Sequence, residues 1–385
     1  MGTINIIVPG DINLRFKVEN MDIIKTIIKL VKSAGAAKKK KMKNNDNDIV
    51  GIWRDRFDEN IPSAVIQKEL RKKTWKRFYI FLLVSFFIIA VSSFSGYAQK
   101  EYTPSEITKI VFLGTGTPNP DPNHSGISVA VIVNNTPYIV DAGPGLVRKA
   151  GAISPDYGGK IEGLRVENIK RAFFTHLHSD HTAGYPELIL IPWIMGRDEP
   201  LEVYGPDGIK AMTTHILEAY KEDIRMRLYG LEQANNRGWK VNAHEFNEGI
   251  IYKDNNITVE AFLVEHGSWP EAYGFKFITP DRVIGISGDT KPCKNLIEKC
   301  KGVDILIHEA YSQEKLKERT PRWQKYHPEY HTSTVELAEI AKQVKPGLVI
   351  LYHQLYWGIS DEALIKEITC IYPGKVVSAR DLDIF

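Results

Sequence analysis

The residues with the clearest capacity for chemistry lie in one short stretch of the chain. His176, His178, Asp180 and His181 occupy four of six consecutive positions, directly after an apolar run that ends at Phe174. In extended backbone, two residues separated by one position project to the same side, so His176 and His178 are expected to point together. Three imidazoles and a carboxylate suit zinc or a similar transition ion. The stretch therefore predicts a metal site at the end of a strand.

The sequence THLHSDHTAGY, which contains this stretch, resembles the signature of the metallo-β-lactamase superfamily. Members of that family are binuclear metal hydrolases with an α/β fold, the αβ/βα four-layer sandwich. The rest of the family pattern follows in order, with His266 in VEHGSW, Asp289 in SGDT and His353 in LYHQ. Each of these residues follows a strand-like run, which lets distant positions converge at one end of a sheet pair.

The ligands that the resemblance implies fall into two sets that share one carboxylate. They are His176, His178 and His266 for the first metal, Asp180, His181 and His353 for the second, and Asp289 as the bridge. Two divalent ions are expected, with zinc as the first expectation and manganese as the alternative. Two cations about 3.5–4 Å apart polarise a water and hold both the attacking and the leaving oxygen. A mononuclear site would use only three or four of these seven ligands.

Further motifs resemble the branch of the family that contains ribonuclease Z and bacterial arylsulfatase-like enzymes. They are VFLGTGTPNP, YIVDAGPG, SGDTKPC, LIHEAY and YHTST, and the similarity covers about residues 106–385. In ribonuclease Z, the histidine that matches His331 is a proton donor to the leaving group, and the glutamate that matches Glu309 lies near it. The resemblance implies that His331 is the general acid and Glu309 its orienting partner, with a simple core pairing as the alternative for Glu309. A carboxylate beside His331 is expected to favour imidazolium.

The chemistry expected from these residues is hydrolysis of a phosphodiester or sulfate ester, of the arylsulfatase or phosphodiesterase type. A metal-activated hydroxide would be the nucleophile, Asp180 would steer its proton while ligating, and His331 would protonate the leaving oxygen. Six aromatic residues near the motifs are candidates for an aryl pocket or for the core: Trp193, Trp269, Tyr311, Trp323, Tyr356 and Trp357. The alternatives are a ribonuclease Z-type endonuclease for tRNA 3′ processing, a hydrolase of carboxylic esters, lactones or β-lactams, and a non-enzymatic metal-binding protein.

Two features argue against RNA and for a small-molecule ester as the substrate. Ribonuclease Z grips tRNA with an inserted arm in the window that corresponds to residues 182–265. Here that window holds a helical pattern, interpreted as a cap over the site and followed by a loop, and it contains no basic arm. Residues 99–385 carry 32 Lys and Arg against 38 Asp and Glu, which weakens the case for a broad surface that binds nucleic acid. A homodimer is compatible with this sequence.

The elements that must position these residues begin near Tyr102. Strand-like apolar runs alternate with helical patterns, as at 333–345 and 360–369, and this alternation predicts a layered α/β body. Asn134 and Asn135 are expected to form a turn between two strands. Asp141, in a glycine-containing loop, is expected to help hold the metal-binding loop.

The segment before this body predicts export. Residues 71–98 contain, in this order, a basic cluster, an apolar run over 78–91 and small residues, as in a signal peptide. An uncleaved membrane anchor through residues 78–91 is the alternative, although a full span needs about 20 residues. The catalytic domain, residues 99–385, would then be periplasmic or secreted, or anchored outside the cytoplasm. Residues 1–70 are interpreted as an incorrectly assigned start or a gene fusion, and 51–73 resemble the tail of small bacterial antitoxins.

Overall fold

The computed structural model describes residues 2–8, 12–18 and 107–385, and the chain divides into two units, residues 1–99 and 100–385. In the first unit, β1 (Gly2–Val8) pairs with β2 (Ile12–Val18) in an antiparallel hairpin. The expected signal or anchor segment lies outside the described residues. No helix among those described is long and apolar enough to cross a membrane.

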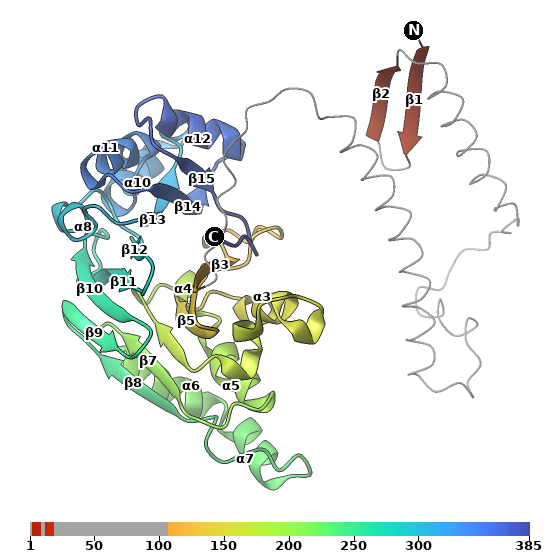
Figure 1. Cartoon of the computed structure of the whole chain (residues 1–385), viewed down its shortest axis with the longest axis vertical. Coiled ribbons are helices and arrows are strands. Elements are labelled where there is room, and N and C mark those ends of the chain that lie inside the picture. The colour runs from red at the N-terminus through yellow and green to blue at the C-terminus, as the bar shows by residue number, and fades with distance from the viewer. Residues whose placement is uncertain (1, 9–11, 19–106) are drawn as a thin grey trace, which may run out of the picture. The chain divides into compact units, whose positions relative to one another are not determined.

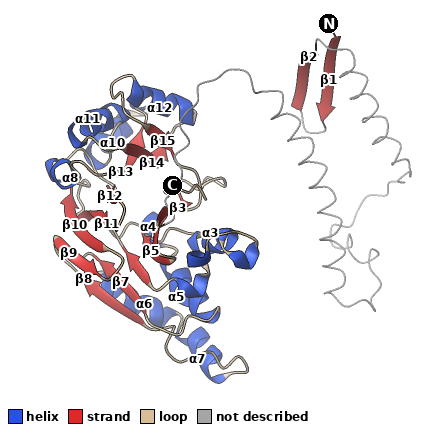
Figure 2. Cartoon of the chain, viewed as in Figure 1, coloured by secondary structure: helices blue, strands red, loops and turns tan. Residues whose placement is uncertain are grey.

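The first sheet of the second unit has six strands in chain order (Figures 1 and 2). They are β3 (Thr108–Gly114), β4 (Ser128–Val133), β5 (Thr136–Val140), β6 (Arg171–Phe173), β7 (Leu201–Gly205) and β8 (Val241–Glu245). The strands β3 to β5 are antiparallel, and β5 to β8 are parallel. Asn134 and Asn135 join β4 to β5 with φ values of 49° and 61°, the left-handed conformation that a two-residue hairpin turn requires.

The second sheet has seven strands, and its sheet order is the reverse of chain order from β15 to β9. They are β9 (Gly249–Lys253), β10 (Thr258–Val264), β11 (Ala272–Ile278), β12 (Val283–Ile286), β13 (Ile305–Tyr311), β14 (Leu348–Leu355) and β15 (Val376–Ser378). The strands β9 to β12 are antiparallel, whereas β12 to β15 are parallel. The carboxyl ends of β12 and β13 therefore lie at one edge of the sheet.

The two sheets pack face to face around a core of fully buried aromatic and branched side chains. Phe173 of β6 meets Phe275 and Phe277 of β11 edge to face, with ring centroids 6.1 and 5.7 Å apart. Such pairs favour one relative placement of the aromatic rings. The core thus fixes β6, whose end carries the histidine-rich stretch, against the second sheet.

Helices cover the outer face of each sheet, which completes the four layers (Figure 2). Over the first sheet lie α3 (Leu146–Ile153), α5 (Tyr185–Ile194), α6 (Ile209–Ala219) and α7 (Lys221–Tyr229). Over the second lie α8 (Lys294–Lys299), α11 (Thr334–Val344) and α12 (Asp361–Thr369). Short 3-10 helices at Pro155–Tyr157, Glu162–Leu164 and Val166–Asn168 lead into β6. The expected αβ/βα sandwich is confirmed.

The expected helical cap over the site is wrong. The pattern does form α6 and α7, but Ile209, Met212 and Ile216 pack against the outer face of the first sheet. A loop does follow α7, over residues 230–240, and the chain then forms β8 and β9. Periodicity identifies the apolar face of a helix, but it does not identify the surface that buries this face.

A buried guanidinium fixes the end of α5. The side chain of Arg197 is 1% exposed and donates hydrogen bonds of 2.7–3.1 Å to the carbonyls of Ile169, Leu188, Ile189 and Gly238. Burial lowers the pKa of Arg197 to about 10, which still leaves the group charged. Arg197 therefore joins α5 to the segments before β6 and β8.

Candidate metal centre

The histidine-rich stretch leaves β6 in extended backbone and then turns into a helix. His178, with φ −61° and ψ 150°, is the last extended residue, and α4 (Ser179–Thr182) begins directly after it. His176 and His178 therefore precede the turn, while Asp180 and His181 lie within it. His176 and His181 are fully buried, as is most of the Asp180 side chain.

The second sheet supplies the other three candidates. His266 and Asp289 follow β10 and β12. His353 lies inside β14, where the pairing with β13 uses Tyr352 and Gln354 and skips the residue between them. His353 has a φ of 48°, so it is the extra residue of a β-bulge. Bulges next to active sites re-aim side chains, and this one directs His353 toward the ligands from the first sheet.

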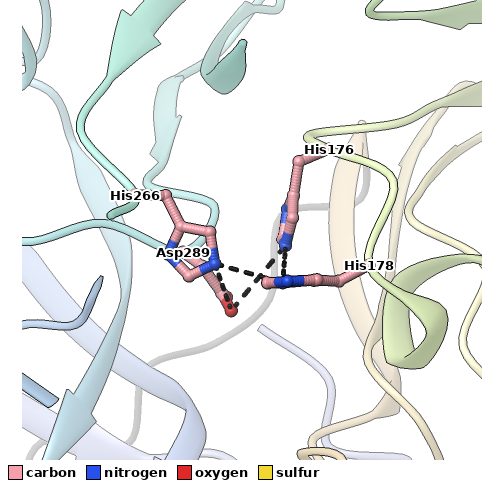
Figure 3. Close-up of side chains that lie close together, drawn as sticks. All are labelled: His176, His178, His266 and Asp289. Atoms are coloured by element: carbon pink, nitrogen blue, oxygen red, sulfur yellow. Dashed lines mark hydrogen bonds and ion pairs between the residues drawn. The ribbon is translucent and has the colours of Figure 1, made fainter. Parts of the chain in front are cut away.

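One group of candidate ligands gathers around His178 (Figure 3). The Nδ1 atom of His178 lies 3.0 Å from Nε2 of His176 and 3.1 Å from Nε2 of His266. The Oδ2 atom of Asp289 lies 4.0 Å from Nε2 of both His176 and His266. These four ligand atoms all lie within 4.8 Å of one another, close enough for one ion to contact them.

The second group lies on the other side of Asp289. The Oδ2 atom of Asp180 is 3.2 Å from Nε2 of His353 and 3.6 Å from Nε2 of His181. Asp289 faces both rings, with Oδ1 3.4 Å from Nε2 of His181 and Oδ2 3.5 Å from Nε2 of His353. The structure thus brings all seven sequence-predicted ligands together, and Asp289 contacts both groups.

The unpaired atoms of this cluster fit two divalent metal ions. Within the described part of the chain, the buried Nε2 of His181 and Oδ1 of Asp289 make no hydrogen bond, although they lie 3.4 Å from each other and Nε2 of His181 lies 3.6 Å from Oδ2 of Asp180. Buried polar atoms are almost always paired, so such atoms indicate a missing ligand. Imidazole nitrogens and carboxylate oxygens are donors that zinc and similar ions accept.

The charges of the cluster are arranged for cations. Burial lowers the pKa of His178 and His266 to about 4, so both rings stay neutral at pH 7, the state that binds metal. Burial also disfavours charge on His353, but Asp289 raises its pKa to about 9. Burial likewise opposes ionisation of Asp289, yet His353 and His181 hold its pKa well below the usual range. Negative charge is therefore held at the midpoint of the two groups.

Residues behind the ligands hold their rings. The Asp141 carboxylate accepts a 2.8 Å hydrogen bond from the backbone N–H of Thr175, and its Oδ2 lies 2.9 Å from Nδ1 of His181. Nδ1 of His266 lies 2.7 Å from the carbonyl oxygen of Tyr330. These contacts orient the free nitrogens toward the centre, and Asp141 takes the supporting position expected from the sequence.

His331 and Glu309 form a buried pair beside the ligands. Nδ1 of His331 is 3.0 Å from both carboxylate oxygens of Glu309, and Glu309 also accepts a 2.8 Å hydrogen bond from the backbone N–H of Thr290. The expectation of a resting imidazolium is wrong, because burial lowers the pKa of His331 to about 4. Burial, together with repulsion from Asp289, raises the pKa of Glu309 well above its usual range. Both shifts favour the uncharged forms of the two groups.

The indole of Trp269 closes one side of the first group. Its Nε1–H lies 2.6 Å from Nε2 of His178 and donates a hydrogen bond to it. Because indole nitrogen only donates, Nε2 of His178 is the acceptor in this arrangement. The ring proton of His178 is then on Nδ1, the atom that faces His176 and His266.

A cavity of about 270 Å³ opens onto the metal groups. Its floor contains Asp180, Asp289, His331 and His353, and its opposite wall comes largely from α10 (Pro321–Tyr330). The wall residues that sequence reasoning missed are Arg319, Tyr326 and His327, with Pro118 and Asn119 at the rim. The only available signal was the aromatic spacing of 323, 326, 327 and 330, which matches one side of a helix.

The candidate aryl-pocket residues divide between wall and core. Trp323 and Trp357 line the cavity. Trp193 is buried under the first sheet. Tyr311 packs behind the wall, with its ring centroid 5.7 Å from that of Trp357. Tyr356 donates a hydrogen bond to Asp361, away from the site.

Comparison with known proteins finds relatives in one superfamily. A family model described as a β-lactamase superfamily domain matches residues 136–354. A ribonuclease Z of Mycobacterium sp. (strain KMS) is 28% identical over 249 residues, which cover 64% of this chain and 84% of that protein. A ribonuclease Z of Anoxybacillus flavithermus is 27% identical and covers 72% of this chain and 96% of its own length.

Solved structures show the same fold. The metallo-β-lactamase fold protein YhfI from Bacillus subtilis aligns with a TM-score of 0.54 and 18% identity, covering 73% of this chain and 99% of its own. The short form of human tRNase Z aligns with a TM-score of 0.53 and 21% identity, covering 72% and 98%. At these identities the likeness concerns the fold.

Proposed function

The chain belongs to the β-lactamase superfamily and is a metal-dependent hydrolase, and we propose that the bond it cleaves is a phosphodiester. The observation that carries this proposal is the position of Asp289, whose two oxygens face both ligand groups at 3.4–4.0 Å. Two ions bound by these residues would supply an activated water and stabilise the negative charge that develops on a phosphoryl group. The ions are proposed to be zinc, with manganese as the alternative.

The protein's own residues would manage the protons. Asp180 lines the cavity, and its carboxylate is placed to accept a proton from the attacking water. Nδ1 of His331 is occupied by Glu309, which leaves Nε2 to give a proton to the departing oxygen. A proton passed from Glu309 to Nδ1 would keep the imidazole neutral, and a proton taken up from solvent would then restore the pair. Glu309 is thus proposed as the orienting partner of His331.

The names of the relatives help to choose between a phosphodiester and a sulfate ester as the bond that is cleaved. Those matched by sequence are named ribonuclease Z, and one structural neighbour is a tRNase Z. These names favour the ribonuclease alternative over the arylsulfatase interpretation, and so a phosphodiester over a sulfate ester. RNA is therefore the first substrate class to test.

A small aryl phosphodiester is the second candidate. A cavity of about 270 Å³ with an aromatic wall is of a size for one small ring-bearing group. The acidic balance of residues 99–385 and the expected export segment at 71–98 also favour a small substrate met outside the cytoplasm. On this candidate, nucleic acid is not a partner.

One assay separates these candidates. The chain loaded with zinc or manganese is offered methyl p-nitrophenyl phosphate, p-nitrophenyl sulfate and an RNA hairpin with a single-stranded 3′ extension. The phosphodiesters should be hydrolysed faster than the sulfate, and His176→Ala should abolish the reaction. Cleavage of RNA with a steep salt dependence supports the first candidate, and cleavage of the small diester alone supports the second. Faster hydrolysis of the sulfate would overturn the proposal.

A further inference from the structure

The cavity beside the metal groups has one wall made mainly of stacked rings. This aromatic wall consists of Trp323 and His327 on α10, Trp357 in the loop after β14, and the guanidinium of Arg319. The rings of Trp323 and His327 are stacked with centroids 5.5 Å apart, and His327 and Trp357 lie 4.7 Å apart. Both tryptophans are half-buried, so each keeps part of its surface available to the cavity.

The His327 ring carries the polar atom of the wall whose burial hydrogen bonding does not explain. Its side chain lines the cavity and is 8% exposed, yet its Nδ1 has no hydrogen-bond partner among the described residues. A buried polar atom of this kind is uncommon unless a ligand completes it. Burial lowers the pKa of His327 to about 4, with repulsion from His331 and Arg319 adding to the effect, so the ring is neutral. A neutral imidazole both donates and accepts hydrogen bonds.

The wall lies next to His331, the proposed proton donor. His331 follows the last residue of α10, one helical turn after His327, and the two ring centroids are 5.8 Å apart. If His331 protonates the departing oxygen, the group attached to that oxygen extends along the wall. Arg319 stands at the outer end of the wall, with its guanidinium carbon 5.4 Å from the centre of the Trp357 ring. Its charge can attract an anionic substrate and pairs with the ring face.

We propose that the aromatic wall is a subsite for a planar aromatic ring carried by the leaving group of the substrate. This proposal rests on the proposed phosphodiesterase function and specifies its substrate class. Two sources share this chemistry, a nucleobase on the departing nucleotide and a simple aryl group on a small ester. Stacking of a ring on an aromatic side chain changes affinity by roughly five- to hundredfold.

The test compares two diesters, one with a planar leaving ring and one with a non-planar ring of the same size. Methyl phenyl phosphate and methyl cyclohexyl phosphate are each assayed with wild type, Trp323→Leu and Trp357→Leu, all loaded with metal. Each substrate is compared with itself across variants, so intrinsic leaving-group reactivity cancels. We expect kcat/KM for the phenyl ester to fall at least five times further than for the cyclohexyl ester. Equal losses on both esters, or no loss on either, would overturn the subsite.

The controls isolate stacking from folding. Trp323→Phe and Trp357→Phe keep a ring and should restore most of the phenyl preference. Tyr229→Leu removes an aromatic ring that is 82% exposed on α7, outside the cavity lining, and should change neither ester. Loss of the phenyl preference in Tyr229→Leu would also count against the subsite.

A second pair of substrates identifies the source of the ring. A dinucleotide with an intact base on the leaving nucleotide is compared with the same molecule lacking that base. His327→Phe keeps a ring but removes the nitrogens. If a nucleobase is the natural ring, this variant should keep its kcat/KM for the phenyl ester and lose kcat/KM for the intact dinucleotide. Retention of both substrates assigns the subsite to a simple aryl group.

A binding measurement separates this proposal from the proposed function. Methyl phenylphosphonate cannot release phenol, and its binding to the metal-loaded chain is followed through tryptophan fluorescence. Binding that weakens in Trp357→Leu supports the subsite even if wild type hydrolyses no diester, in which case the phosphodiesterase function alone fails. Hydrolysis of diesters without a Trp357-dependent preference leaves the function standing and removes the subsite.

Discussion

The proton-donor role of His331 gives the sharpest prediction, because it depends on the leaving group. His331 is 7% exposed, and its Nδ1 is held by both oxygens of Glu309 at 3.0 Å. Removing the ring entirely would leave the fully buried Glu309 without its partner, at a cost of about 1–3 kcal/mol in stability. His331→Gln is the better perturbation, since its amide can donate to Glu309 but cannot deliver a proton.

The expected magnitude follows from what general acid catalysis contributes. A positioned acid accelerates a reaction by roughly 10²–10⁴-fold when the leaving group needs a proton. His331→Gln should therefore lower kcat for methyl phenyl phosphate by about that factor. For methyl p-nitrophenyl phosphate, whose leaving group departs as a stable anion, the loss should stay below about tenfold.

The assay measures kcat and KM for both esters in wild type and His331→Gln at matched metal content. Metal analysis and thermal unfolding confirm that both proteins are loaded and folded. Equal losses on the two esters would refute the proton-donor role. They would indicate that His331 instead supports the neighbouring ligands, since its Nδ1 also lies 4.0 Å from Oδ2 of Asp289.

The remaining predictions concern metal, pH and stability. Asp289→Ala should lower the metal content from two ions per chain to one or fewer, as measured by elemental analysis. The pKa of His266 is about 4 in the folded chain and about 6.5 in the unfolded one, so its contribution to stability is complete above about pH 6.5 and is lost as the pH falls toward 4. His266→Gln should flatten that fall in the Tm of the metal-free protein. A metal ion held by Nδ1 of His178 would leave the ring proton on Nε2, where it conflicts with the Trp269 indole N–H. Metal addition should therefore shift the indole and change a fluorescence signal that Trp269→Phe lacks. Arg197→Met should cost roughly 3 kcal/mol in urea unfolding, because four buried carbonyls lose their donor.

More of the metal site than of the cavity could be predicted from the sequence, for a physical reason. Four of the ligands lie within six positions, and the other three each follow a strand-like run, so a local pattern carries most of the information. The way in which His353 reaches the centre could not be foreseen. It depends on a left-handed residue in a bulge, which arises from the pairing of β13 with β14 rather than from local sequence.

The wall of the cavity depends on tertiary packing in the same way. Trp323 and His327 stand in a segment with two prolines and many charges, which carries no strong helical signal. Only the packed structure shows that this segment is a helix facing the metal groups. The low pKa of His331 could also not be predicted without the fold, because burial outweighs the attraction of the neighbouring carboxylate.

The metal ligands and the contacts to the leaving group come from different elements, and this limits how far the relatives define the substrate. The metal ligands come from strand ends, the short helix α4 and one bulge, all of which the two-sheet core holds in place. The aromatic wall and His331 both depend on α10, so the leaving-group contacts and the proton donor move together if this helix changes. A chain can therefore keep the two-metal chemistry of its relatives while α10 selects a different leaving group. Measurements on α10, rather than on the ligands, will decide whether RNA or a small aryl diester is the substrate.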